Sequence, residues 1–320
     1  MATVVILDSV YSAYDEERSV FEPMGIIPRI SPTTDEQEII DLCRNADGIC
    51  VNLAPMPASV INELDRCRVI ARYGVGYDNV DVDAAAQKGI WVANVTDYCG
   101  EDVSDQAMAL LLSCARKTAR RDAQVRAHQW AINTSDPVYR IKGKTFGFLG
   151  FGMIARIVNR KLKGFEPGNV LAADPFIDSE TVKQHGAELV DFDTVIRKSD
   201  FISIHMPLNE KTRHIISDKE FKAMKPTAIL INTSRGPVID EEALVRALET
   251  GWINSAGIDV FEQEPLPENS RLKKLENITL SDHTGWYSEE SLSELKTKTA
   301  RNVRAVLEGS RPDYPVNEIE

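Results

Sequence analysis

The sequence is poor in the features that mark secreted and membrane-spanning proteins. Its five cysteines are odd in number and show no C-x-x-C spacing, which favours reduced thiols in a cytoplasmic protein over a disulfide framework or a zinc site. No stretch approaches the roughly 18 apolar residues of a membrane-spanning helix. The N-terminus has no basic region ahead of its first apolar run, Val4 to Leu7, so we expect a strand there and not a signal peptide.

Basic residues are also in deficit. The 37 lysines and arginines against 49 aspartates and glutamates give a formal net charge of -12, which argues against a nucleic-acid or anionic-membrane partner. We interpret the one basic cluster as the solvent-exposed face of a helix, and we predict no metal site. That cluster consists of Arg116, Lys117, Arg120, Arg121 and Arg126. What remains is an ordinary globular composition over 320 residues, a length that suits two domains.

Strand and helix patterns alternate through both halves of the chain. Alternation of this kind predicts doubly wound parallel sheets with helices on both faces, the α/β class. In the first half we expect strands at 4–7, 26–30, 48–51, 69–73 and 90–93, and helices from about 14, from 34, at 57–64 and at 80–88. In the second half we expect six strands, at 146–149, 170–173, 201–205, 228–232, 256–260 and 278–281.

The segment between the two halves reads as one long helix from about 99 to 128, which we expect to bridge two domains. Residues 129–144 have no clear period and predict a loop or a contact between subunits of a homodimer. The last helix, 289–308, is expected to pack on the first domain. The predicted domains are therefore 1–98 with 287–320, and 99–286, with ligands bound in a cleft between them.

A glycine-rich turn follows the strand at 146–149. Gly150, Gly152 and Ala155 fit the pattern G-x-G-x-x-G/A, in which backbone N–H groups and a helix N-terminus receive a pyrophosphate. The pattern alone also fits a plain turn from strand to helix. The acid that ends the next strand, Asp174, sits where ribose hydroxyls are bound, and no positive charge follows it, which favours NAD over NADP. The turn supplies the cofactor-binding candidates Gly150, Phe151, Gly152, Met153 and Ile154.

Three charged residues follow late strands of the second half, where open α/β sheets place ligands. Arg235 could clamp a carboxylate and polarise the neighbouring carbonyl. His283 could donate a proton, and Glu264 beside it would favour the protonated imidazole near neutral pH. The alternatives are an ion-pair partner for the arginine, a solvent-exposed loop position for the glutamate and a backbone cap for the histidine.

Six segments, in order, resemble the signatures of the D-isomer-specific 2-hydroxyacid dehydrogenases. They cover nearly the whole chain. They are 71–81 (ARYGVGYDNVD), 143–152 (GKTFGFLGFG), 205–208 (HMPL), 232–240 (NTSRGPVID), 257–265 (GIDVFEQEP) and 283–290 (HTGWYSEE). The resemblance implies two Rossmann-like or flavodoxin-like domains, the cofactor NAD, a 2-oxo acid or D-2-hydroxy acid substrate and a homodimer.

The resemblance also implies roles for individual residues. The catalytic set falls on Arg235, Glu264 and His283, and backbone N–H groups of Val75 and Gly76 face the substrate carboxylate. Val103 is matched only loosely, because the helix start reads Val-Ser-Asp in place of the family's V-A-E. The further implied cofactor contacts are His205, Pro207, Thr212, Thr233, Asp259, Val103 and Gly285.

The segment from His283 to Glu290 resembles in particular the branch of the family that contains the C-terminal binding proteins. That branch implies substrate contacts from Trp286 and Arg72, for which a buried indole and a surface ion pair are the alternatives. In the pocket, Trp286 would favour a substrate with an extended side group over glyoxylate. The branch also raises an alternative function, an NAD(H)-sensing dimeric adaptor. Glu264 argues against a formate-type dehydrogenase, in which this position is typically not acidic.

Overall fold

The computed structural model describes residues 2–7, 11–130 and 136–319, and the chain forms two compact units. The first unit contains the residues up to Cys99 and those from Ser288 onward, and the second runs from Gly100 to Tyr287. The predicted domain limits each lie one residue before these boundaries. No helix in the described parts of the chain combines the length and the apolar character needed to cross a membrane.

The first unit is built on a five-stranded sheet whose strand pairs are all parallel. Its order is β2-β1-β3-β4-β5, which is the flavodoxin-like order. The strands are β1 (Val4–Leu7), β2 (Arg29–Ser31), β3 (Gly48–Val51), β4 (Val69–Arg72) and β5 (Trp91–Ala93). β2 is shorter and begins later than expected. It is the edge strand and has no buried residue, so its sequence carries little apolar signal.

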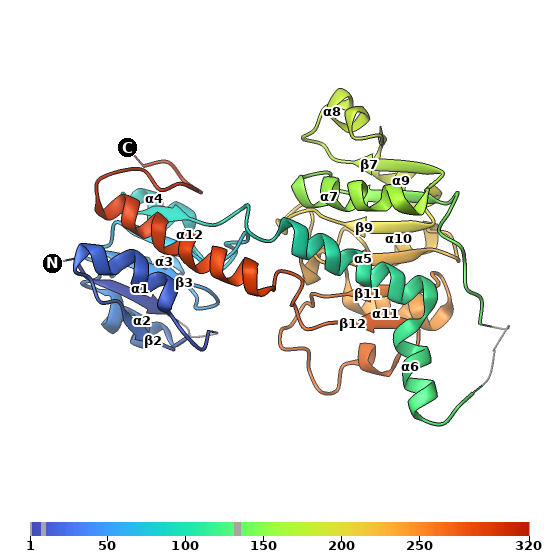
Figure 1. Ribbon diagram of the computed structural model, residues 1–320, viewed down its shortest axis with the longest axis horizontal. Helices are drawn as coiled ribbons and strands as arrows, with labels where there is room; N and C mark the ends of the chain where they lie inside the picture. The colour runs from blue at the N-terminus through green and yellow to red at the C-terminus, as the bar shows by residue number, and fades with distance from the viewer. Residues whose placement is uncertain (1, 8–10, 131–135, 320) are drawn as a thin grey trace. The chain divides into compact units, whose positions relative to one another are not determined.

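Helices cover both faces of this first sheet. On one face, α2 (Glu36–Cys43), α3 (Ala58–Ile61) and α4 (Val82–Gln87) bury apolar side chains against alternate strand residues such as Val5, Ile49 and Ile70. On the other face, α12 (Glu289–Leu307) contacts β3 and β4 and lies beside α1 (Asp15–Phe21) (Figure 1). A short 3-10 helix, η1 (Glu22–Met24), follows α1. The last helix therefore packs on the first unit, as expected.

The second unit is built on a seven-stranded parallel sheet of order β12-β11-β10-β9-β6-β7-β8. This is the doubly wound dinucleotide-binding order, with its switch point between β6 and β9. The strands are β6 (Thr145–Leu149), β7 (Asn169–Ala173), β8 (Glu188–Leu189), β9 (Phe201–Ile204), β10 (Ile229–Asn232), β11 (Ser255–Ile258) and β12 (Ile278–Leu280). All six expected strands are present. The added strand, β8, has two residues and no periodicity to read.

Two layers of helices sandwich this sheet (Figure 1). One core contains Phe146, Phe148 and Ile231 with residues of α5 (Gly100–Arg116) and α7 (Met153–Leu162). The other contains Ile202 and Leu230 with residues of the helices on the opposite face. Strand residues thus alternate between the two cores. The remaining helices are α8 (Ser179–Gln184), α9 (Phe192–Lys198), α10 (Asp218–Ala223) and α11 (Glu241–Thr250), with 3-10 turns η2 (Lys163–Phe165), η3 (Gly236–Val238) and η4 (Arg271–Lys274).

The expected single helix over 99–128 is wrong. Lys117 adopts a left-handed conformation with φ of 57° and separates α5 from α6 (Thr118–Arg126). Its ammonium and the Arg120 guanidinium pair with Asp136, so these two members of the basic cluster are not part of a solvated face. α5 lies wholly in the second unit and is not a bridge. In the segment 129–144, residues 131–135 lie outside the described ranges, and 136–144 form neither helix nor strand.

Candidate active site

The glycine turn after β6 requires glycine at its first position. Gly150 has φ of +85°, and a Cβ atom there would lie 2.7 Å from the His205 carbonyl oxygen. The turn is held from both neighbouring strands, since Gly150 N donates to the Ala173 carbonyl and His205 N donates to the Leu149 carbonyl. Any side chain would therefore force the β6 and β9 ends apart.

The second glycine opens the start of α7. Gly152 is the N-cap residue, no side chain caps the helix, and a Cβ atom at Gly152 would meet nothing within 4 Å. The space beside it and the first N–H groups of the helix are what a pyrophosphate needs. Met153 and Ile154 form the first turn, and the fully buried Ala155 packs the helix against the sheet. The turn fits a dinucleotide.

Asp174 is tied into the same turn. Its Oδ2 accepts a hydrogen bond from Phe151 N at 2.8 Å, and its Oδ1 accepts one from Phe176 N at 2.9 Å. Each carboxylate oxygen keeps a further lone pair for a ribose hydroxyl. Phe176 is almost fully exposed, and Pro175 carries no charge. The position thus offers an anionic acceptor and no cation for a 2′-phosphate, which fits NAD.

The loop after β10 carries a buried threonine hydroxyl that forms no hydrogen bond with the described residues. Asn232 fixes this loop by accepting hydrogen bonds from Ser234 N and Oγ and by donating to the Arg235 carbonyl at 3.0 Å. Thr233 Oγ1 is buried and has no hydrogen-bond partner among the described residues. A buried polar atom without a partner costs stability unless a ligand or water satisfies it. Thr233 therefore fits its predicted place beside the nicotinamide.

His205 follows β9 at the switch point of the sheet. Burial lowers the pKa of its imidazole from 6.5 to about 3, so the ring is neutral at physiological pH. Its Nε2 lies 2.8 Å from Ser203 Oγ. Further along this loop, Thr212 Oγ1 donates to the Pro207 carbonyl at 2.6 Å and accepts from Asn209 N. The three predicted cofactor contacts of this segment thus lie on one hydrogen-bonded loop.

The neutral His205 makes stability depend on pH. Its folded-state pKa is below that of the unfolded chain, so the unfolded state binds the proton first as the pH falls below 6.5, and stability is lost toward pH 3. Between pH 7 and pH 5, wild type should lose about 2 kcal/mol of its free energy of unfolding through His205, and His205→Gln should not show this loss. Urea unfolding at the two pH values measures it. His128→Asn, at an exposed histidine, is the control, and equal acid sensitivity in wild type and His205→Gln would contradict the assignment.

Glu264 and His283 form the centre of the site. His283 Nδ1 lies 2.6 Å from Glu264 Oε2, and Phe261 N donates to Glu264 Oε1 at 2.9 Å. Burial would raise the pKa of the Glu264 carboxyl, but the hydrogen bond from His283, the Phe261 N–H and the charge of Arg235 hold it below its usual 4.5. The structure therefore brings together the carboxylate and imidazole that the sequence placed 19 residues apart.

Arg235 is held close to this pair by backbone packing. Its Nη1 donates to the Ser234 carbonyl at 2.8 Å, and its charge acts on Glu264. The next residue, Gly236, packs directly on the Phe261 backbone, where a Cβ atom would lie 1.9 Å from the Phe261 carbonyl carbon. The loop that carries Arg235 and the loop that carries Glu264 are therefore fixed against each other.

The remaining predicted residues of the second unit have mainly buried positions. Asp259 is 2% exposed, and its Oδ2 accepts from Gly285 N at 3.0 Å. Val103 is buried in α5. Trp286 is half-buried and packs edge-on against the Tyr287 ring, 5.7 Å between centroids. Of these, Trp286 has the largest surface still open to a ligand.

In the first unit, the predicted substrate residues follow β4. Asn94 Nδ2 donates to the Val75 carbonyl at 2.7 Å and holds the turn, in which Gly74 has φ of +125°. Within the described ranges, neither Val75 N nor Gly76 N donates a hydrogen bond. Arg72 ends β4, and its guanidinium folds over Gly74, where a Cβ atom would lie 1.8 Å from Arg72 Nη1. The free N–H groups are what a carboxylate requires.

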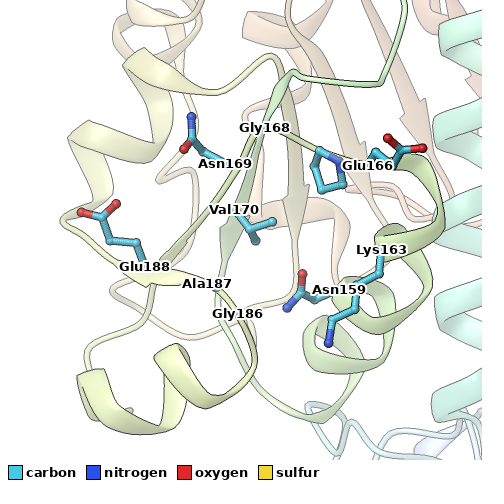
Figure 2. Close-up of a pocket in the computed structure, with 10 residues that line it drawn as sticks. Asn159, Lys163, Glu166, Gly168, Asn169, Val170, Gly186, Ala187 and Glu188 are labelled. Atoms are coloured by element: carbon cyan, nitrogen blue, oxygen red, sulfur yellow. The ribbon is translucent and has the colours of Figure 1, made fainter.

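One cavity in the described part of the chain lies away from this chemistry. It measures about 430 Å³ and opens at the edge where β7 begins, between Lys163, Asn169 and Glu188 (Figure 2). Parallel sheets bind ligands at the opposite, carboxyl edge. A smaller cavity of about 30 Å³ adjoins Ser113 and Asn277. No described group of His, Cys, Asp and Glu residues could hold a metal ion.

A doubly wound sheet with a dinucleotide turn and an arginine, glutamate and histidine at its carboxyl edge defines an NAD-dependent dehydrogenase. The family model for the D-isomer specific 2-hydroxyacid dehydrogenase, NAD binding domain, matches residues 108–285. Glyoxylate reductase of Korarchaeum cryptofilum is 39% identical over 88% of this chain and 85% of that protein. D-3-phosphoglycerate dehydrogenase of Methanocaldococcus jannaschii is 34% identical over 99% of this chain, which spans 60% of that protein.

A solved structure supports the same assignment. The crystal structure of a glyoxylate reductase from Paecilomyes thermophila superimposes with a TM-score of 0.89, at 29% identity, over 98% of each chain. The chain belongs to the D-isomer specific 2-hydroxyacid dehydrogenase family. It is an oxidoreductase that transfers a hydride between NAD(H) and a 2-oxo acid or the corresponding 2-hydroxy acid.

Some residues that shape this site were not found from the sequence. Asn232 organises the loop of Thr233 and Arg235, and Gln106 and Ser281 bind the carboxylate of Asp259. Gln106 carries a usable signal, because it is a polar residue beside the buried positions Val103, Ala107 and Leu110 of α5. A polar side chain on such a face needs a partner. The identity of that partner was not readable from the sequence.

Proposed function

We propose that the enzyme reduces a small 2-oxo acid with NADH and that His283, Glu264 and Arg235 form its catalytic set. The observation that carries this proposal is the 2.6 Å contact between His283 Nδ1 and Glu264 Oε2 beside the charge of Arg235. Because Nδ1 faces the carboxylate, the proton available for transfer is on Nε2. Bound NADH supplies the hydride.

The residues of the chain perform the rest of the reaction. Arg235 binds the substrate carboxylate through its planar fork and polarises the adjacent carbonyl. His283 donates the Nε2 proton to the carbonyl oxygen while the carbonyl carbon receives the hydride, so the 2-oxo group becomes a 2-hydroxyl group. Glu264 stays ionised and stabilises the imidazolium before the transfer. Arg72, Val75 and Gly76 of the first unit and Trp286 stay predictions as substrate contacts.

For the substrate we propose glyoxylate or a 2-oxo acid of similar size, supported by the glyoxylate reductases among the relatives. A Trp286 side chain in the pocket would instead favour an extended side group. The test is NADH oxidation with glyoxylate, hydroxypyruvate, pyruvate, 4-methyl-2-oxopentanoate and phenylpyruvate. The highest kcat/KM for glyoxylate or hydroxypyruvate supports the proposal. A clear preference for the branched or aromatic acids would contradict it and point to a substrate with an extended side group. No turnover of any of them would contradict the dehydrogenase function.

We also propose a homodimer in the cytoplasm. α6 has no buried residue, and the apolar Val125 and Trp130 on and after it are 51% and 90% exposed, as expected of a subunit contact. The five cysteines are buried and form no disulfide, which supports a reducing compartment. Light scattering at micromolar concentration measures the assembly.

The relationship to the C-terminal binding protein branch and its adaptor function stays a prediction, and an NADH-dependent dimer without turnover would be its signature.

A further inference from the structure

The catalytic histidine has a strained backbone. His283 adopts φ of +57°, a conformation that costs a non-glycine residue on the order of 1 kcal/mol or more and persists only where its surroundings fix it. It lies in the loop 281–285 that follows β12. The position of the imidazole against Glu264 therefore depends on whatever holds this loop.

Asp259, the residue directly after β11, holds this loop. Its carboxylate accepts hydrogen bonds from Ser281 Oγ at 2.6 Å, Thr284 N at 3.2 Å and Gly285 N at 3.0 Å. Its backbone carbonyl accepts one from His283 N at 2.8 Å. Four of the five loop residues are thus bonded to Asp259, which is itself 2% exposed. Asp259 acts in this unit as the anchor of the histidine loop.

A side chain from another element completes this anchor. Gln106 of α5 donates from Nε2 to Ser281 Oγ at 2.8 Å and approaches Asp259 Oδ1 at 3.4 Å. The direction of this relay is fixed by chemistry: the amide nitrogen can only donate, the carboxylate can only accept, and the single Ser281 proton goes to Asp259. Bonds that polarise one another in a buried chain strengthen one another.

We propose that Gln106 is a positioning residue for His283, acting through Ser281 and Asp259. This inference rests on the proposed function, in which His283 donates the proton. The Gln106 amide donates to Ser281 and Asp259, which in turn hold the loop of His283. It orients Ser281 and Asp259 from the helix side, so the strained loop keeps the imidazole within reach of Glu264.

The test replaces Gln106 by an apolar side chain of similar length. We expect Gln106→Met to lower kcat about 10- to 100-fold, the cost of a small misplacement of a reacting group, with little change in KM for the 2-oxo acid or in NADH affinity. Ser281→Ala should reproduce the fall in kcat at nearly unchanged KM, and Ser281→Thr, which keeps the hydroxyl, should restore most of the activity.

The matched control is Ser113→Ala. Ser113 also lies on α5 and also binds the β12 segment, with Oγ 3.2 Å from Thr279 Oγ1, but it does not contact the loop 281–285. The Ser113→Ala variant should have a lower melting temperature but unchanged kcat and KM. A Gln106→Met protein that lost only stability, as Ser113→Ala does, would overturn the positioning role while leaving the proposed function intact. If Gln106→Met does not fold, wild-type kcat in Ser281→Ala overturns it.

Discussion

Replacing His283 by asparagine should reduce kcat/KM for the 2-oxo acid by about a thousandfold, within the range that a positioned general acid contributes. Asparagine is the better test than alanine because His283 has φ of +57°, and asparagine is one of the few residues that accept this conformation. The loss should therefore come from the missing proton donor and not from a displaced loop. Initial rates of NADH oxidation measure it.

The cofactor should still bind to His283→Asn. The turn at Gly150, the Thr233 hydroxyl and Asp174 all lie on other loops, so NADH affinity, followed by nucleotide fluorescence, should stay near the wild-type value. Glu264→Gln is the informative partner variant. It keeps the shape of the side chain but removes its charge, and it should cost less than the loss of the imidazole. Wild-type turnover by His283→Asn would refute the proton-transfer role.

The sequence predicted the strands of both sheets apart from β8, because the signals of these strands are local. Buried strands such as β3 and β9 appear as short apolar runs, and each turn that must be glycine, as at Gly150, is visible as glycine. The break between α5 and α6 was missed because both sides have helical composition. What separates them is the left-handed Lys117, stabilised by Asp136 nineteen residues away. No local pattern announces such a contact.

The sequence predicted the residues of the candidate site that carry its chemistry, but not the residues that hold them in position. Arg235, Glu264 and His283 are charged residues after apolar strands, so their position at one edge follows from the parallel sheet. The residues that hold them have no such mark: Ser281 and Gln106 become informative only once the register of β11 and β12 places Asp259 beside the loop. Side-chain networks between distant segments are set by tertiary packing.

Replacing Arg235 by glutamine should lower kcat/KM by roughly 100- to 1000-fold, the usual cost of losing one electrostatic stabiliser of the transition state. Arg235→Lys should fall between glutamine and wild type, because an ammonium keeps the charge but cannot bind a carboxylate through two parallel N–H groups. Melting temperatures of both variants, measured beside wild type, separate loss of the substrate contact from loss of stability.

The pH profile of Arg235→Gln separates a substrate clamp from a mere ion pair. The charge of Arg235 is one of the causes that hold the pKa of Glu264 below 4.5. Without it, Glu264 takes up its proton at a higher pH on acidification, so the acidic fall of kcat/KM should move upward. In Arg235→Ala, added guanidinium should restore part of the activity by refilling the vacated position. If the acidic limb moves upward while the plateau value of kcat/KM is unchanged, Arg235 is only an ion-pair partner of Glu264. If the plateau value falls and added guanidinium restores it, Arg235 is the group that binds the substrate.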